Sequence, residues 1–161
     1  PAPVVPAAPS PTPAPPPAPS RPPTLLLVSA QASDRAAWRE AIGGCACRVV
    51  EARSGPEALE CLVREPADLV LMDVALPGMD GFDVTRVVKS QPNLSALPVV
   101  LAADRLERSH YAFGIQSGAN EVLVKPLEPA RLRERLGQLL RHRGFPLPGW
   151  APGPAAVPPR G

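Results

Sequence analysis

A lone carboxylate at the end of an apolar run is the residue of this sequence most suited to chemistry. Asp73 closes the run Asp68–Asp73 and is followed by a loop that contains Pro77, Gly78 and Gly81. A buried strand with this ending delivers its carboxylate to the carboxyl edge of a parallel sheet, where open α/β sheets carry their chemistry. A carboxylate there can help to hold a cation or can pair with a cationic side chain, and Lys125 follows another apolar run.

The stretches around Asp73 alternate short apolar runs with segments of helical period. Strands are expected at Thr24–Ser29, Arg48–Ala52, Asp68–Asp73, Leu97–Ala102 and Glu121–Val124. Helices are expected from Ser33 or Asp34 to about Ile42, after Ser54, after Asp80, from about Leu106 to Gln116, and from Pro129 onward. Five strands alternating with five helices predict an α/β fold with a parallel sheet covered on both faces.

Local signals define several helix ends and buried faces. Ser33 or Asp34 is expected to cap the first helix, Ser54 the second and Asp80 the third. The apolar stripe of the second helix is expected to comprise Ala58, Leu59, Leu62 and Val63.

The segment D-L-V-L-M-D-V-A-L-P-G-M-D-G-F-D around Asp73 resembles the phosphoacceptor strand and loop of bacterial response regulator receiver domains. The stretch Ser117–Pro126 resembles the same family's Gly-Ala, fifth strand and Lys-Pro ending. Lys125 lies 52 positions after Asp73, a separation typical of the family. The resemblance covers about Leu25 to Leu140. It implies a doubly wound, flavodoxin-like sheet of order 2-1-3-4-5 and a cis Lys125–Pro126 peptide.

The resemblance also implies roles for the site residues. Asp73 would be the phosphoacceptor, Lys125 a fixed cation beside the phosphate, and the backbone carbonyl of Ala75 a ligand for Mg²⁺. An acyl phosphate adds about two negative charges, which a hard divalent cation held by oxygen ligands would offset. The structural alternative is that Asp73 is paired with Lys125 and is otherwise silent.

The sequence departs from the family where the metal should bind. The acidic pair after the first strand is replaced by Ser29 and Ala30, followed by Gln31. Three formal negative charges therefore become one, and we expect Mg²⁺ binding to be weak or absent. Asp34 and Asp104 are the carboxylates that could assist a metal, but a helix cap and a solvated loop residue are the expected roles.

The positions that report phosphorylation in the family are also altered. Ala103 stands where a Thr or Ser at the end of the fourth strand would donate to the phosphate, and Val122 stands where a Tyr or Phe would follow it inward. Alanine cannot donate, and valine has no ring to reorient. A weak conformational switch is expected.

Proline and charge delimit the folded part. Twelve of the 25 prolines lie in residues 1–23 and six in residues 144–161. We therefore expect a receiver domain at 24–143 between two disordered, extended flanks that are too poor in buriable apolar surface to fold. All 15 acidic residues and 15 of the 17 basic ones fall within the domain. The domain is thus neutral, and nucleic-acid binding is not indicated.

No stretch approaches the ~18 apolar residues of a membrane span, and Leu25–Val28 is too short for a signal sequence. Cys45, Cys47 and Cys61 lack metal-binding spacing and are expected to be reduced. Reduced cysteines and the lack of a membrane span or signal sequence lead us to expect a cytoplasmic location. The sequence does not begin with Met and has Pro-rich ends, which suggests a piece of a longer or processed protein.

The last helix carries Arg131, Arg133 and Arg135. A solvated face is the default for such a charge run, and a surface for partner docking or oligomerisation is the alternative.

The predicted function is that of a non-enzymatic receiver domain in two-component or phosphorelay signalling. It would act through protein–protein contacts, with a histidine kinase, a phosphotransfer domain or tethered domains of a longer chain, and its phosphorylation site would be impaired. The alternative is a working Mg²⁺-dependent phosphoacceptor that a histidine kinase phosphorylates on Asp73.

Overall fold

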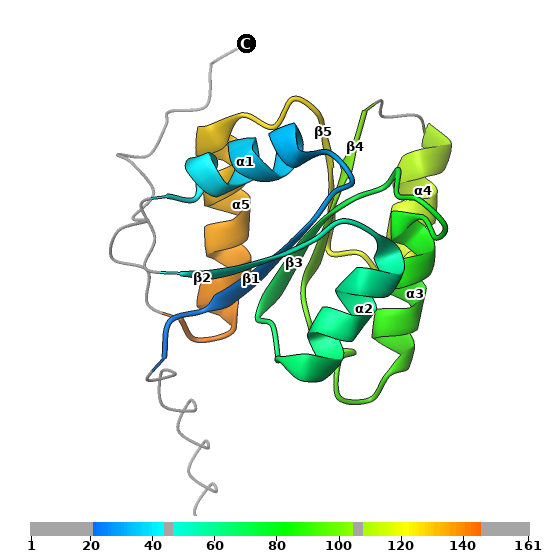
Figure 1. Cartoon of the computed structure of the whole chain (residues 1–161), viewed down its shortest axis with the longest axis horizontal. Helices are drawn as coiled ribbons and strands as arrows, with labels where there is room; N and C mark the ends of the chain where they lie inside the picture. The colour runs from blue at the N-terminus through cyan, green and yellow to red at the C-terminus, as the bar shows by residue number, and fades with distance from the viewer. Residues whose placement is uncertain (1–20, 44–46, 105–107, 146–161) are drawn as a thin grey trace, which may run out of the picture.

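The computed structural model describes residues 21–43, 47–104 and 108–145, and it places strands and helices in strict alternation (Figure 1). The strands are β1 Thr24–Val28, β2 Arg48–Ala52, β3 Leu69–Asp73, β4 Val99–Ala103 and β5 Glu121–Val124. The helices are α1 Ala32–Ala41, α2 Gly55–Arg64, α3 Gly81–Ser90, α4 Arg108–Ser117 and α5 Pro129–His142.

The strands form one parallel sheet in the order β2-β1-β3-β4-β5, which confirms the predicted doubly wound topology. Met72 of β3 is paired with Val28 of β1 on one side and with Leu101 of β4 on the other. The carboxyl ends of these strands therefore meet at one edge of the sheet, where Asp73 lies.

Successive side chains of each strand enter opposite layers of core, as the period of two requires. Leu25 and Leu27 pack with Trp38 of α1 and Leu136 of α5 on one face. On the other face, side chains of β1, β3 and β4 pack with α2 and α3, through residues that include Leu26, Val28, Val70, Leu101, Leu62 and Val88. Figure 1 shows α1 and α5 together on one side of the sheet and α2, α3 and α4 on the other.

Two of the three predicted helix caps are confirmed. Ser54 Oγ accepts a hydrogen bond from the amide of Glu57 at 3.3 Å, and Asp80 Oδ1 accepts one from the amide of Asp83 at 2.8 Å. The prediction for α1 is wrong, because the helix begins earlier and Gln31 occupies the cap position without a side-chain cap bond. Asp34 is thus free of a capping role and lies in the first turn of α1.

Two further expectations are corrected. Val63 is 87% exposed, so the buried stripe of α2 is narrower than predicted and leaves this residue in solvent. The fourth strand begins at Val99 rather than Leu97 and extends to Ala103. Pro98, which has no amide hydrogen, contributes only its carbonyl, which accepts from the amide of Val70.

The apolar stripe of α5 is buried at Leu132, Leu136 and Leu140, and its arginines lie outside this stripe. Arg131 and Arg133 are exposed, whereas Arg135 lies 3.7 Å from Glu121 of β5. The arrangement fits a solvated face and leaves the docking alternative open. The Lys125–Pro126 peptide is cis, as predicted.

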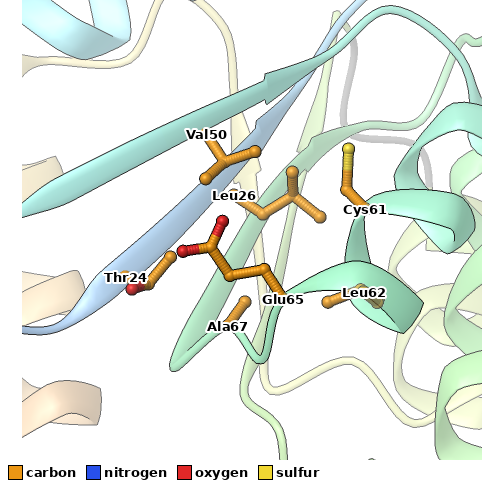
Figure 2. A pocket seen from close by; sticks show the side chains of 7 residues that line it. All are labelled: Thr24, Leu26, Val50, Cys61, Leu62, Glu65 and Ala67. Carbon is orange, nitrogen blue, oxygen red and sulfur yellow. The ribbon is translucent and has the colours of Figure 1, made fainter.

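A small pocket lies between the second half of α2 and strands β1 and β2 (Figure 2). It is lined by Thr24, Leu26, Val50, Cys61, Leu62, Glu65 and Ala67. Burial raises the pKa of the Cys61 thiol, and neighbouring Glu57 adds to the effect. The pocket shares no residue with the surroundings of Asp73.

Cys61 is a free thiol, but Cys47 is disulfide-bonded, so the expectation of reduced cysteines is wrong for Cys47. Cys45 and most of the Pro-rich flanks lie outside the described residues, and their predicted states stay predictions. None of the helices in the described part of the chain combines the length and the apolar character needed to span a bilayer.

Candidate functional site

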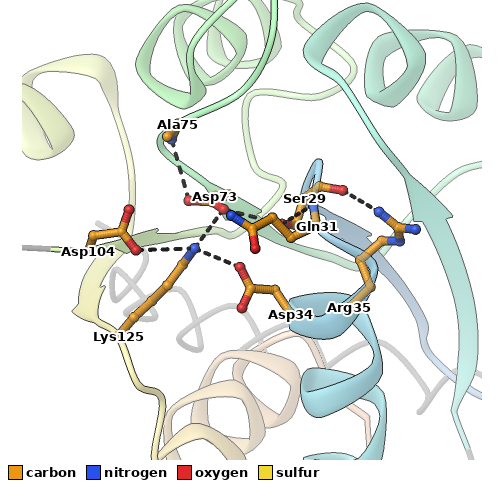
Figure 3. A network of polar contacts seen from close by, with 8 residues as sticks. All are labelled: Ser29, Gln31, Asp34, Arg35, Asp73, Ala75, Asp104 and Lys125. Atoms are coloured by element: carbon orange, nitrogen blue, oxygen red, sulfur yellow. Dashed lines mark hydrogen bonds and ion pairs between the residues drawn. The ribbon is translucent and has the colours of Figure 1, made fainter.

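Asp73 is the buried centre of the candidate site, with 3% of its surface exposed (Figure 3). Its Oδ2 atom lies 2.6 Å from Lys125 Nζ and accepts a hydrogen bond from Ser29 Oγ at 3.2 Å. Its Oδ1 atom accepts a weaker bond from the amide of Ala75 at 3.4 Å. β1, β3 and the segment after β5 therefore bring Ser29, Asp73 and Lys125 together, although they are far apart in the sequence.

Lys125 places its ammonium group between carboxylates from three parts of the chain. Besides Asp73, Nζ lies 2.8 Å from Asp34 Oδ2 and 3.6 Å from Asp104 Oδ1. The ammonium also lies 6.0 Å from the centroid of the Trp38 ring. Burial by itself lowers the pKa of Lys125, but the hydrogen bonds to Asp34 and Asp73 outweigh burial and leave the pKa above its ordinary value. Lys125 is therefore held as a cation.

Asp34 and Asp104 contribute unequally to this cluster. The Asp34 side chain is 27% exposed and forms a hydrogen-bonded ion pair, whereas the Asp104 side chain is 77% exposed and lies farther away. Sequence reasoning placed both residues near this edge of the sheet but assigned Asp34 to a helix cap. The pair with Lys125 spans 91 positions and joins α1 to the segment after β5, so local signals could not reveal it.

Ser29 and Ala30, at the positions of the missing acidic pair, differ in environment. Ser29 is fully buried, and its Oγ accepts a hydrogen bond from the amide of Gln31 at 3.1 Å while it donates to Asp73. Ala30 is exposed and has no polar side-chain atom. Arg35 adds positive charge nearby, because its Nη1 donates to the Ser29 carbonyl at 2.5 Å.

A polar pocket lies beside this point, at the carboxyl end of β2. It is lined by Arg35, Glu51, Arg53 and Glu57, so its formal charges cancel. Arg35 Nε lies 3.2 Å from Glu51 Oε1 within it.

Ala103 and Val122 are both buried. The carbonyl of Ala103 accepts a hydrogen bond from the amide of Lys125 at 2.7 Å, so this residue fixes the backbone that carries the lysine. Val122 packs tightly against α4, since a Cβ on Gly114 would lie 2.5 Å from Val122 Cγ2. Neither side chain offers a hydrogen-bonding group to the site.

The loop after Asp73 returns to the strand at Gly81. The amide of Gly81 donates to the carbonyl of Val74 at 2.9 Å. A Cβ at Gly81 would lie 2.7 Å from the Asp73 carbonyl oxygen and 3.0 Å from Val74 Cα. Glycine is required here because the start of α3 touches the backbone of the site.

Comparison with known proteins matches residues 25–137 to the response regulator receiver domain. The chain belongs to this family. Response regulator PleD of Caulobacter vibrioides is 39% identical over 95 residues, which cover 59% of this chain and 21% of PleD. Transcriptional regulatory protein AfsQ1 of Streptomyces coelicolor is 34% identical over 120 residues, covering 74% of this chain and 52% of AfsQ1.

The fold is shared with solved receivers. The crystal structure of chemotaxis response regulator CheY4 of Vibrio cholerae superposes with a TM-score of 0.70 at 26% identity, covering 74% of this chain and all of CheY4. The chain spans about a fifth of PleD and about half of AfsQ1. It is thus a receiver domain, similar to the receiver portions of longer regulators.

The side chains of this receiver fit a divalent cation poorly. Asp73 Oδ2 already accepts from Lys125 and Ser29, and the nearby Ala30 cannot serve as a side-chain ligand. Across residues 21–43, 47–104 and 108–145, no group of three or more His, Cys, Asp or Glu residues could hold a metal ion. The Ala75 carbonyl and one carboxylate are a small ligand set even for magnesium, which keeps several waters.

Proposed function

We propose that this receiver works as a protein–protein interaction module in two-component or phosphorelay signalling, with an impaired phosphorylation site at Asp73 and no enzymatic activity of its own. The observation that carries the proposal is the charge balance at Asp73. One buried carboxylate faces Lys125 directly, and Ser29 and Ala30 add no negative charge. A divalent cation gains little from such a site.

The surroundings of Ala103 and Val122 support the same proposal. A phosphoryl group on Asp73 would meet a methyl group at Ala103 in place of a hydroxyl donor. Val122 is packed against α4 and has no aromatic ring that could change its position. Phosphorylation would therefore produce little rearrangement on the face formed by α4 and β5.

The partners proposed for the module are a histidine kinase, a phosphotransfer domain, or tethered domains of a longer cytoplasmic protein. The family relationship supports this class of partner, since the matching regulators are much longer than the region of similarity. Contacts through α5 and its neighbours, including self-association, belong to the same proposal. Nucleic acid is not among the proposed partners, because the acidic and basic residues of the domain balance.

A second candidate function is that of a working phosphoacceptor. The retained pair of Asp73 and Lys125, 2.6 Å apart, favours it. In that case a histidine kinase would phosphorylate Asp73 with Mg²⁺, and Lys125 would lie beside the phosphate.

Intact-mass spectrometry distinguishes the two functions. The protein is titrated with Mg²⁺ in the presence of a small phosphodonor, and in parallel with beryllofluoride, which mimics the acyl phosphate. We expect less than about a tenth of the chains to carry an adduct, because too few anionic ligands hold the cation. A stoichiometric, Mg²⁺-dependent adduct that is absent in Asp73→Asn would establish the phosphoacceptor and reject the interaction module.

The double substitution Ser29→Asp and Ala30→Asp restores the acidic pair and tests whether the missing charge is what weakens Mg²⁺ binding. Two added carboxylates should tighten Mg²⁺ binding by on the order of tenfold or more, measured by calorimetry. Unchanged Mg²⁺ affinity in this variant would show that missing charge is not what impairs the site.

A further inference from the structure

Helix α1 directs two side chains toward the site. Asp34 and Trp38 are four residues apart and therefore share a face of the helix. Asp34 Oδ2 lies 2.8 Å from Lys125 Nζ, and the Trp38 ring lies 6.0 Å from the same atom. Figure 3 shows Asp34 and Asp73 approaching the ammonium from different elements.

The Lys125 ammonium is shared between the carboxylates of Asp34 and Asp73. Lys125 Nζ has a carboxylate oxygen at 2.6 Å and another at 2.8 Å, both within the range of charge-assisted hydrogen bonds. The lysine side chain is only 13% exposed, so water competes little for these bonds. Because Gln31 rather than Asp34 occupies the cap position of α1, the Asp34 carboxylate is available for this contact.

We propose that Asp34 is a positioning residue, which holds the Lys125 ammonium against Asp73. Asp73, Lys125 and Asp34 then form a triad in which two carboxylates share one ammonium, so the protein's own cation balances part of their negative charge. This inference rests on the proposed function in that the triad explains how an impaired site keeps Asp73 buried and paired. It involves no phosphoryl group and no metal.

Nitrogen-15 NMR of lysine ammonium groups tests the triad directly. The chain contains only two lysines, Lys89 and Lys125, so the spectrum is simple. Exposed ammonium protons exchange rapidly with water, whereas protons in strong hydrogen bonds exchange slowly. Lys89 serves as the internal reference, because its Nζ is held by the Leu97 carbonyl at 2.5 Å and by Asn120 Oδ1 at 3.2 Å, away from the site.

In the full chain we expect a slowly exchanging Lys125 signal, assigned by Lys125→Arg. Asp34→Asn should speed its exchange with water roughly tenfold, as expected for the loss of one charge-assisted hydrogen bond. Asp34→Glu should restore slow exchange, and the Lys89 signal should not change. The matched control is Asp104→Asn, which removes the more distant and exposed carboxylate and should leave Lys125 unaffected.

Three results would overturn the proposal: no slowly exchanging Lys125 signal in the unmodified chain, an unchanged exchange rate in Asp34→Asn, or an equal effect of Asp104→Asn. A purely structural role of Asp34 in the first turn of α1 would alter thermal stability but not the exchange of Lys125. The measurement uses neither Mg²⁺ nor a phosphodonor. A negative result would therefore reject the role of Asp34 without rejecting the proposed function, which the Mg²⁺ and phosphodonor experiments test separately.

Discussion

At the scale of single residues, the burial of Asp73 depends on Lys125. The Asp73 side chain is 4% exposed, and a carboxylate at such a position must be paired or hydrogen-bonded to remain charged. Ser29 Oγ supplies one neutral hydrogen bond. The ammonium supplies the charge, and its removal leaves a buried anion with inadequate compensation.

We expect Lys125→Met to lower the free energy of unfolding by about 3 kcal/mol at neutral pH. The substitution removes one partner of a buried ion pair and leaves the Asp73 carboxylate buried without a countercharge. Asp73→Asn should cost less, since Lys125 keeps Asp34 as a partner. The double variant should recover part of the loss. Urea denaturation of the four proteins gives the coupling energy, and a Lys125→Met variant as stable as the unmodified chain would contradict this account.

At the scale of elements, the junction of β3 and α3 is set by Gly81. The helix begins against the backbone of Asp73, and a side chain at Gly81 would overlap the Asp73 carbonyl oxygen at 2.7 Å. Backbone atoms on the buried strand β3 cannot give way easily, because β3 is hydrogen-bonded between β1 and β4.

Gly81→Ala should therefore destabilise the domain by about 2 kcal/mol through overpacking. Gly78 offers the matched control, because it lies in the same loop at φ +78° with no atom within 4 Å of an added Cβ. Asn tolerates this backbone conformation, so Gly78→Asn should have a smaller effect. Chemical denaturation measures both variants, and equal losses would mean that the close contact at Gly81 is not decisive.

Element type and order followed from the sequence because the signals are local. Buried parallel strands appear as short apolar runs, as in Leu69–Met72, and Ser54 and Asp80 are side-chain caps that act within three residues. The start of α1 was misplaced because Gln31 has no side-chain cap bond that the sequence could signal.

The candidate site was predictable only in part. Asp73 ends β3 and Lys125 follows β5, so their proximity could be expected from the topology of the sheet. The ion pair of Asp34 with Lys125 depends on how α1 packs beside the segment after β5, and the exposure of Val63 depends on how much of α2 contacts the sheet. Both are tertiary effects that periodicity does not encode.

At the scale of the whole molecule, the two ends of the described chain meet at the edge of the sheet opposite Asp73. Arg21 forms two hydrogen bonds with buried Asp68, at 2.7 Å and 3.0 Å, and its guanidinium carbon lies 5.6 Å from the centroid of the Phe145 ring. Asp68 also accepts from the amide of Thr24 at 2.8 Å. Packing thus extends beyond the predicted limits of 24 and 143 at both ends.

The end of α5 explains how Phe145 reaches this point. Gly144 adopts φ +93°, its amide donates to the Arg141 carbonyl, and the amide of Phe145 donates to the Leu140 carbonyl. These two bonds are those of a Schellman motif, which turns the chain back onto the helix. Phe145 is consequently 3% exposed and packs in the core with Leu140.

Arg21 should therefore stabilise both ends together. We expect Arg21→Met to lower the free energy of unfolding by about 1–2 kcal/mol, a value reduced by the half-exposed position of the arginine. Amide hydrogen exchange at Gly144 and Phe145 should quicken as well, because the cation that covers the Phe145 ring is lost. Arg141→Met, at an exposed position near the end of α5, is the control for loss of one positive charge. If Arg21→Met leaves exchange at Gly144 and Phe145 unchanged, or if Arg141→Met quickens it equally, Arg21 does not join the two ends.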